Sequence, residues 1–269
     1  MAIEMPNKAK AFNSTEEFNK LRKFSNLAEG IKKVNILIYG ESGSGKTTAA
    51  CTMPGPVLIH SFDPNGSLSV AELVAEGRII SDDRYQLEDM RSPRAWMKWE
   101  QEMSIRMATG FFTHIGTLVI DSITLWSQAC LNDILRLAGR PGAIPQQQDY
   151  NVMTSRIRDW FQKLTTLPCS LVMTAHVDIS KDDTTGRILA GPMIVGKLKK
   201  AAMLYFDEVY VSIAKSGAKG TEYSLTTAGD GTFPARTRIG RNKLFEIHET
   251  PDIRQMLKKA GIDIPDKVY

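Results

Sequence analysis

Cysteine and long apolar stretches are scarce in this chain. Its 269 residues include three cysteines, Cys51, Cys130 and Cys169, which lie far apart and lack the spacing of a metal site. We therefore expect reduced thiols in apolar surroundings. No apolar run approaches the roughly 20 residues that a membrane-spanning helix needs, and residues 1–12 lack the apolar segment of a signal peptide. These absences predict a soluble, cytoplasmic protein with no membrane partner.

Internal repeats and low-complexity segments are also absent, and the charge balance is only mildly basic. Lysine and arginine total 34 against 30 for aspartate and glutamate, which gives a formal net charge of +4. This balance is compatible with a nucleic-acid partner but does not indicate one. The hydrophobic fraction of 42% is enough for one sizeable core.

The chain divides into three predicted parts. Residues 1–30 form an N-terminal extension, in which Ser14 and Glu17 make a capping box and predict a short helix from Thr15 to about Lys23. This helix either lies on the surface or docks as an arm on a neighbouring subunit. Residues 31–248 form the predicted core, and residues 249–269 supply a C-terminal helix and tail.

The most informative stretch is Gly40–Thr48, which fits the phosphate-binding loop pattern G-x-x-x-x-G-K-[ST] at every fixed position. An apolar, β-prone segment precedes it and a helix-prone segment follows it, as the mechanism requires. Lys46 can reach the β- and γ-phosphates of ATP, and the Thr47 hydroxyl can ligate Mg²⁺. The predicted nucleotide-binding residues are Gly40, Glu41, Ser42, Gly43, Ser44, Gly45, Lys46, Thr47 and Thr48.

A second stretch, Thr117-Leu-Val-Ile-Asp-Ser122, reads as a buried strand that ends in a carboxylate. Downstream of a phosphate-binding loop, this is the Walker B pattern. Asp121 then joins Thr47 as the predicted Mg²⁺ ligands. The next residue is Ser122, whereas AAA+ ATPases usually place a catalytic Glu there.

Two more predicted strands end in polar residues. Val57-Leu-Ile59 runs into Asp63, and Ser170–Ala175 runs into His176. Ligands of an open parallel sheet bind beyond the carboxyl ends of its strands, so both side chains are candidates for the reaction site. The alternatives are a turn aspartate before proline and an ordinary loop histidine. The predicted catalytic residues are Lys46, Asp63, Asp121 and His176.

Two later stretches contain bases but no acids. The first runs from Thr184 to Phe206 and includes part of a long, apparently irregular segment, Val177–Gly196. The second runs from Gly231 to Phe245. Such stretches suit phosphodiester binding, although a solvated basic helix or a basic sheet edge fits the same pattern. Their cations are Arg187, Lys197, Lys199 and Lys200 in the first, and Arg236, Arg238, Arg241 and Lys243 in the second.

Together these residues resemble a RecA-family ATPase core over about residues 31–248. More closely, the chain is similar to compact, phage-encoded RecA-like nucleotide-binding proteins, some of which are single-strand annealing recombinases. The resemblance implies an α/β fold with a mostly parallel sheet and helices on both faces. Asp63 takes the place of a Glu that activates water, and His176 that of a Gln that couples the γ-phosphate to DNA.

The resemblance also implies two DNA-binding loops and a shared active site. Arg140–Gln148 corresponds to the first loop and Val177–Gly196 to the second. The implied DNA-binding residues are Arg140, Lys181, Arg187, Lys197, Lys199 and Lys200. The implied cations that reach a neighbour's ATP are Arg236, Arg238, Arg241 and Lys243.

We therefore expect a DNA-stimulated ATPase of bacteriophage recombination or annealing, which binds single-stranded DNA as a filament or ring in the bacterial cytoplasm. A single-strand DNA-binding protein is a candidate partner. The main alternative is an ATP-driven motor or switch that acts on a protein, of packaging or partition type. A small-molecule kinase ranks last, because the sequence shows no arginine-rich lid.

Overall fold

A computed structural model of the chain describes residues 13–23, 30–86, 88–181, 186–194, 198–218, 220–240 and 244–268. The chain falls into two units, Met1–Lys32 and Lys33–Tyr269. The first unit contains helix α1, Ser14–Lys23. Its cap is Asn13 and not Ser14, because the Asn13 side chain accepts a hydrogen bond from the Glu16 amide at 3.2 Å.

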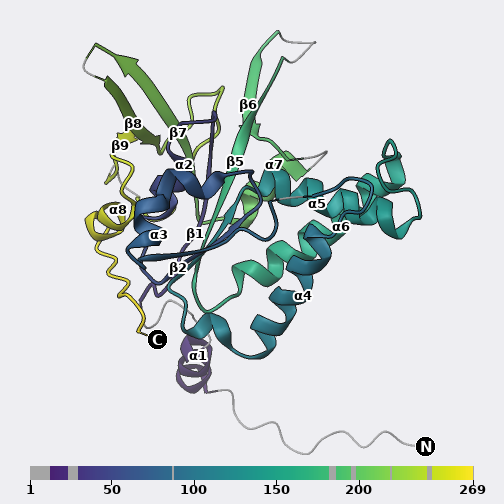
Figure 1. Ribbon diagram of the computed structural model, residues 1–269. Helices are drawn as coiled ribbons and strands as arrows, with labels where there is room; N and C mark the ends of the chain where they lie inside the picture. The colour runs from purple at the N-terminus through teal and green to yellow at the C-terminus, as the bar shows by residue number, and fades with distance from the viewer. Residues whose placement is uncertain are drawn as a thin grey trace, which may run out of the picture. The chain divides into compact units, whose positions relative to one another are not determined.

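The described residues of the second unit form a nine-stranded sheet in the order β3-β2-β4-β5-β1-β7-β8-β9, with β6 paired to β5 (Figure 1). The strands from β3 to β7 in this order are parallel, and β8, β9 and β6 join antiparallel. Their bounds are β1 Asn35–Gly40, β2 Val57–Ser61, β3 Ile79–Asp82, β4 Thr117–Asp121, β5 Ser170–Lys181, β6 Ile188–Pro192, β7 Glu208–Gly217, β8 Gly220–Thr226 and β9 His248–Glu249.

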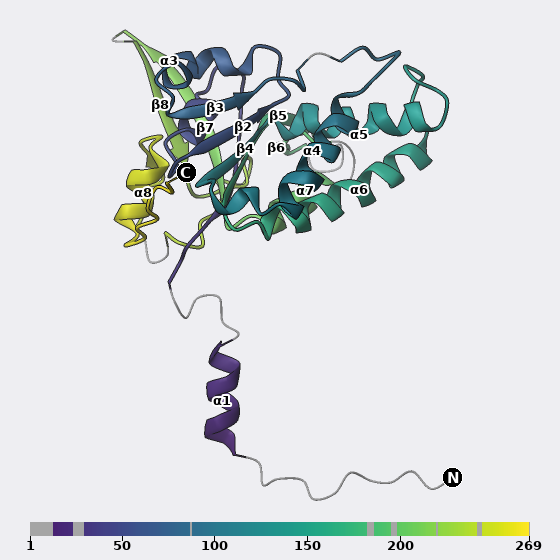
Figure 2. The same cartoon turned by 60° about the horizontal axis from the view of Figure 1, so that its bottom comes forward.

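Helices cover both faces of this sheet (Figures 1 and 2). The helices α4 Ala95–Ala108, α5 Ile123–Leu137, α6 Gln147–Thr165 and α7 Leu198–Ala202 pack on one face, and α2 Lys46–Ala50 and α3 Ala71–Ala75 on the other. Because β1, β2, β4 and β5 are buried on both faces, they read as continuous apolar runs. Helix α8, Ile253–Lys259, is tied to the turn after α2 by a 2.8 Å hydrogen bond from the Ile253 amide to Thr52 Oγ1.

The core between α4, α5 and α6 is aromatic. The ring centroids of Trp99 lie 5.1 Å from those of Trp96, 5.3 Å from Trp126 and 4.6 Å from Trp160. All four side chains are buried. These four tryptophans therefore belong to the packed core.

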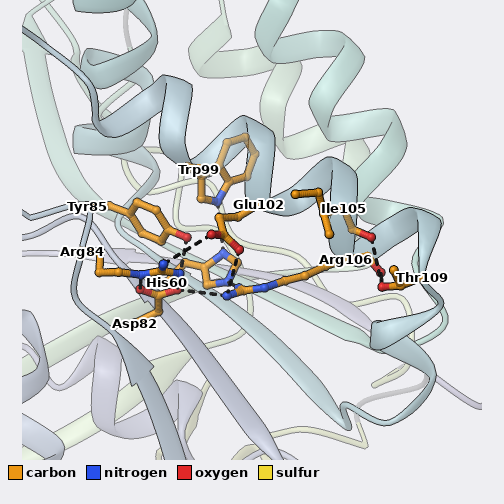
Figure 3. Close-up of polar contacts among 9 residues, drawn as sticks. All are labelled: His60, Asp82, Arg84, Tyr85, Trp99, Glu102, Ile105, Arg106 and Thr109. Atoms are coloured by element: carbon orange, nitrogen blue, oxygen red, sulfur yellow. Dashed lines mark hydrogen bonds and ion pairs between the residues drawn. The ribbon is translucent and has the colours of Figure 1, made fainter.

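A buried polar network joins this core to the sheet (Figure 3). His60 on β2 accepts a 3.1 Å hydrogen bond at Nδ1 from Trp99 Nε1, and its Nε2 lies 2.7 Å from Arg106 Nη1. Arg106 also contacts Asp82, at the end of β3, at 3.2 Å. Burial lowers the pKa of His60 to about 3, and the neighbouring Arg106 charge adds to this effect. His60 is therefore a neutral core residue.

The structure corrects two predictions for the late part of the chain. The Val177–Gly196 segment is not irregular where it is described, since β5 continues to Lys181 and β6 returns beside it as an antiparallel hairpin. Conversely, the basic Gly231–Phe245 segment is mostly not a strand. Among its described residues, one isolated bridge pairs Arg236 with Val209.

A membrane span is also not found among the helices that the structure describes, because none is both long enough and apolar enough.

Candidate active site

The Gly40–Thr48 loop begins at the carboxyl end of β1, between β5 and β7. A Cβ atom on Gly40 would lie 2.3 Å from the carbonyl oxygen of Ser212 on β7, so a side chain there would collide with backbone. Ser212 also donates a 2.6 Å hydrogen bond from Oγ to the Ser44 carbonyl. Strand β7 therefore holds the loop in place from one side.

Lys46 lies inside this loop. Its side chain is buried, and Nζ donates to the carbonyls of Gly40 at 3.1 Å and Glu41 at 2.7 Å. Burial lowers the pKa of Lys46, while the charges of Asp121 and Asp63 oppose this shift. A buried ammonium group inside a glycine-rich loop suits an anionic ligand.

Asp121, at the end of β4, is brought to the loop as predicted. Thr47 Oγ1 donates a 2.8 Å hydrogen bond to Asp121 Oδ2, and the Thr174 hydroxyl of β5 donates to Oδ1. Burial raises the pKa of Asp121, and the charge of nearby Asp63 adds to this rise. This carboxyl group therefore sits in a place where a cation would stabilise its charged form.

Asp63 follows β2 and faces His176, which lies within β5. His176 Nε2 lies 2.9 Å from Asp63 Oδ2, and Ser122 donates to Oδ1 from its amide at 3.1 Å and its hydroxyl at 2.5 Å. Burial acts to raise the pKa of Asp63, but the hydrogen bonds from His176 and Ser122 outweigh it, and the net pKa lies below the ordinary value. Asp63 is therefore held as a charged, oriented carboxylate.

The oxygen atoms of Asp121 and Thr47 fit Mg²⁺, which prefers carboxylate and hydroxyl oxygen together with phosphate and water. In the described part of the chain, no group of three or more His, Cys, Asp or Glu side chains forms a metal site. A magnesium ion at Asp121 and Thr47 would thus take its remaining oxygens from a phosphate ligand and from water.

Comparison with known families agrees with this geometry. Residues 32–239, the greater part of the chain, match the family AAA_24, described as an AAA domain. The chain belongs to this AAA domain family. It is a P-loop ATPase, and the predicted fold class, an α/β P-loop NTPase with a RecA-like core, is confirmed.

Solved structures of low sequence identity also match this AAA domain. They include the KaiC-like protein PH0186 from the hyperthermophilic archaeon Pyrococcus horikoshii OT3, with a TM-score of 0.37, 14% identity, and 71% of this chain and 76% of that chain covered. The flagellar accessory protein FlaH from Methanocaldococcus jannaschii has a TM-score of 0.36 and 12% identity, with 77% and 82% covered. An ATPase from the type III secretion system of pathogenic bacteria has a TM-score of 0.41 and 15% identity, with 67% and 52% covered. No curated protein matches.

The described DNA-binding candidates of the AAA domain fall into two places. The β5–β6 hairpin carries Lys181 and Arg187 and is contacted by Lys199, whereas Arg140 lies elsewhere. Arg140 lies in the α5–α6 connection, where it pairs with Asp149 at 2.9 Å. Lys181 ends β5, and Arg187 precedes β6 on the exposed hairpin. Lys199 Nζ contacts Asp178 Oδ2 at 2.9 Å. Lys197 and the side chain of Lys200 lie outside the described residues.

The four predicted trans-acting cations also differ from one another. The Arg236 guanidinium donates to the carbonyls of Met203 at 2.5 Å and Phe206 at 2.7 Å, which gives it a structural role inside its own chain. Arg238 Nη1 lies 3.2 Å from Asp207 Oδ1, and its side chain is 48% exposed. Arg241 and Lys243 lie outside the described residues.

Sequence reasoning did not single out Ser122, Thr174 or Ser212 as site residues. Ser122 directly follows Asp121, and Thr174 precedes His176 by two positions, so both could have been suspected from their neighbours. Ser212 carries no such signal, because its contact with Ser44 depends on β7 lying beside β1.

Proposed function

We propose that this AAA domain ATPase acts on single-stranded DNA in recombination or strand annealing, as an oligomer of its own chain and in a bacteriophage context. ATP and Mg²⁺ are the proposed ligands. The loop Gly40–Thr48 receives the triphosphate, and Thr47 and Asp121 hold the metal ion. When bound, Mg²⁺ supplies charge neutralisation at the phosphate oxygens.

Asp63 is the proposed general base for the attacking water. It is a carboxylate with a lowered pKa, and Ser122 fixes one of its oxygens while His176 faces the other. A base held in this way can accept a proton in the transition state. Lys46 and the loop amides stabilise the negative charge of the transferred phosphate.

One observation carries the DNA part of the proposal, and it is the continuity of β5. His176 contacts Asp63 in the site, and the same strand runs on to Lys181 beside the tip of the hairpin. The hairpin is also tied back to the site, since the Met193 amide donates a 2.7 Å hydrogen bond to the His176 carbonyl. A change at Asp63 on nucleotide binding therefore has a short, direct route to the hairpin.

The hairpin has the chemistry that a nucleic-acid backbone requires. Its exposed cations, Lys181 and Arg187, flank its tip, and exposed apolar side chains, Ile179 and Ile188, accompany them. Cations attract phosphates, and exposed apolar side chains can pack against the faces of unstacked bases. In an oligomer, repeated hairpins would line a continuous path for a strand.

The proposal is tested by the binding of a fluorescent oligothymidylate, measured by anisotropy at low salt. We expect tighter binding with Mg²⁺ and a non-hydrolysable ATP analogue than without nucleotide. The double variant Lys181→Ala/Arg187→Ala should lose most of this binding while it still binds the analogue. The matched control is Lys163→Ala, which removes an exposed lysine from α6, away from the hairpin.

Two outcomes would contradict the DNA proposal. DNA binding that is equally tight with and without nucleotide would show that the site and the hairpin are not coupled through β5. Analogue binding without any retention of DNA would favour the alternative of a motor or switch that acts on a protein partner. Transfer of phosphate to a metabolite instead of water would favour the kinase alternative.

A further inference from the structure

An aromatic side chain of strand β8 in the β7–β8 hairpin, that of Tyr223, lies at contact distance from the phosphate-binding loop. A Cβ atom on Gly45 would lie 3.1 Å from Cδ1 of Tyr223 and 3.7 Å from its Cε1. The Tyr223 ring therefore covers Gly45 at contact distance. The same side chain is 44% exposed, so part of the ring stays open to solvent beside the loop.

The register of the hairpin explains why this ring faces the loop. Tyr223 is the cross-strand partner of Ala214, which follows Ser212 by two residues on β7. Alternate residues of a strand share a face, and Ser212 points to the loop because it bonds to the Ser44 carbonyl. Tyr223 thus lies on the loop-facing side, and the small Ala214 leaves space beside its ring.

The catalytic groups fix the direction in which a nucleotide crosses the loop. Asp63 follows β2, Asp121 ends β4 and His176 lies within β5. These three strands lie on one side of β1, whereas β7 and β8 lie on the other. If the γ-phosphate lies beside these three side chains, the nucleoside leaves the loop toward β7 and β8. The exposed ring that it meets there is Tyr223.

We infer that Tyr223 packs against the nucleoside of the bound nucleotide, with its ring against the base. This inference rests on the proposed function, since it takes Gly40–Thr48 as the triphosphate site. Every base offers a flat apolar face to an aromatic side chain. Removal of such a ring costs roughly 5-fold to 150-fold in affinity.

The test compares two ligands that share a triphosphate and differ in the nucleoside. Calorimetry on the full chain measures the binding of the ATP analogue AMP-PNP and of tripolyphosphate, each with Mg²⁺. Tyr223→Ala should bind AMP-PNP at least about 5-fold more weakly, with tripolyphosphate unchanged. Tyr223→Phe keeps the ring and should bind both ligands like the wild type. Glu222→Ala, on the opposite face of β8, is the matched control.

Several results would overturn this role. If Tyr223→Ala lowers the affinity for both ligands equally, the ring only supports the loop. If the affinity for both ligands is unchanged, the ring contacts neither ligand. Leu68 offers an alternative site, because it is 73% exposed in the turn Gly66–Val70 after Asp63. If Leu68→Ala and not Tyr223→Ala selectively lowers the affinity for AMP-PNP, the nucleoside lies on the Asp63 side of the loop. If the wild-type chain binds neither ligand, the proposed function itself fails.

Discussion

Two carboxylates meet at the site, and their surroundings divide the work between them. Asp121 is buried with a raised pKa and contacts the hydroxyls of Thr47 and Thr174, which suits a group that a metal ion will keep charged. Asp63 has a lowered pKa and is held by Ser122 and His176. Separate environments for two nearby acids are typical of sites where one acid binds and the other exchanges a proton.

Lys46→Ala is expected to abolish ATP turnover. The substitution removes the buried ammonium group of the phosphate-binding loop, so binding of the triphosphate and stabilisation of its transferred phosphate both fail. The circular dichroism spectrum should remain that of the wild type, because the sheet and its helices do not depend on this side chain. ATPase activity near the wild-type rate would overturn the assignment of the loop.

Asp63→Asn is expected to lower kcat by about 100-fold or more, because an amide cannot accept a proton from water. The affinity for ATP should stay within a few fold, since the loop and not Asp63 holds the triphosphate. Steady-state kinetics with Mg·ATP separate the two effects. An unchanged kcat, or a change confined to KM, would show that Asp63 takes no part in the chemical step.

The sequence located the residues of the site that belong to local patterns. Lys46, Thr47 and Asp121 were predictable because a loop pattern and a strand-end carboxylate are local features. Ser122 was missed as a partner of Asp63 because their contact depends on β2 lying beside β4, which pairs Ser61 with Asp121. Arg236 was misjudged for a similar reason, since the carbonyls that it bonds lie about thirty residues earlier in the chain.

At the scale of elements, the β5–β6 hairpin is what the sequence described least well. In the segment from Val177 to Gly196, apolar and polar residues alternate over only four positions, Val177–Ser180, and the returning arm contains Gly191 with Pro192, so the strand signal is short on both arms. These arms form strands because they pair with each other, from Val177–Pro192 to Lys181–Ile188. The buried strands of the central sheet were predictable, since their apolar runs do not depend on a partner.

The His60 network, which links β2 to α4, predicts that the chain loses stability in acid. His60 has a pKa of about 3 in the folded chain against 6.5 in the unfolded chain, so below pH 6.5 the unfolded state binds more protons. Stability is therefore fully present above pH 6.5 and falls as the pH drops. The expected loss from pH 7 to pH 5 is about 2 kcal/mol for this residue.

The measurement is urea denaturation at both pH values for the wild type and for His60→Gln. The variant is less stable at pH 7 but should lose about 2 kcal/mol less than the wild type on acidification. Equal losses in the two proteins would mean that His60 is not the group that titrates.

At the scale of the whole molecule, the described charged groups of the site, Lys46, Asp63 and Asp121, all come from one chain. Lys46, Thr47 and Asp121 come from strands and loops of one chain, as do Asp63 and His176. Among the described residues, Arg238 is the remaining candidate for a trans-acting cation, because the Arg236 guanidinium donates to backbone carbonyls of its own chain. Arg238 is exposed and its partner Asp207 is a surface acid, so this arginine can exchange partners when subunits meet.

A composite site between subunits predicts complementation. Arg238→Ala and Lys46→Ala should each lose turnover alone. In a mixture, an Arg238→Ala subunit keeps its intact loop and receives Arg238 from a Lys46→Ala neighbour, so part of the activity should return. Full activity of Arg238→Ala alone, or no recovery on mixing, would show that the site lies within one chain.

The central claim is that a P-loop ATPase site is coupled through β5 to a hairpin that binds single-stranded DNA. It is tested most directly by the ATP turnover of the wild-type chain at low salt, with and without single-stranded DNA. The account predicts a higher rate with DNA, and the loss of this increase, but not of the basal rate, in Lys181→Ala/Arg187→Ala. A basal ATPase rate that single-stranded DNA leaves unchanged would contradict it.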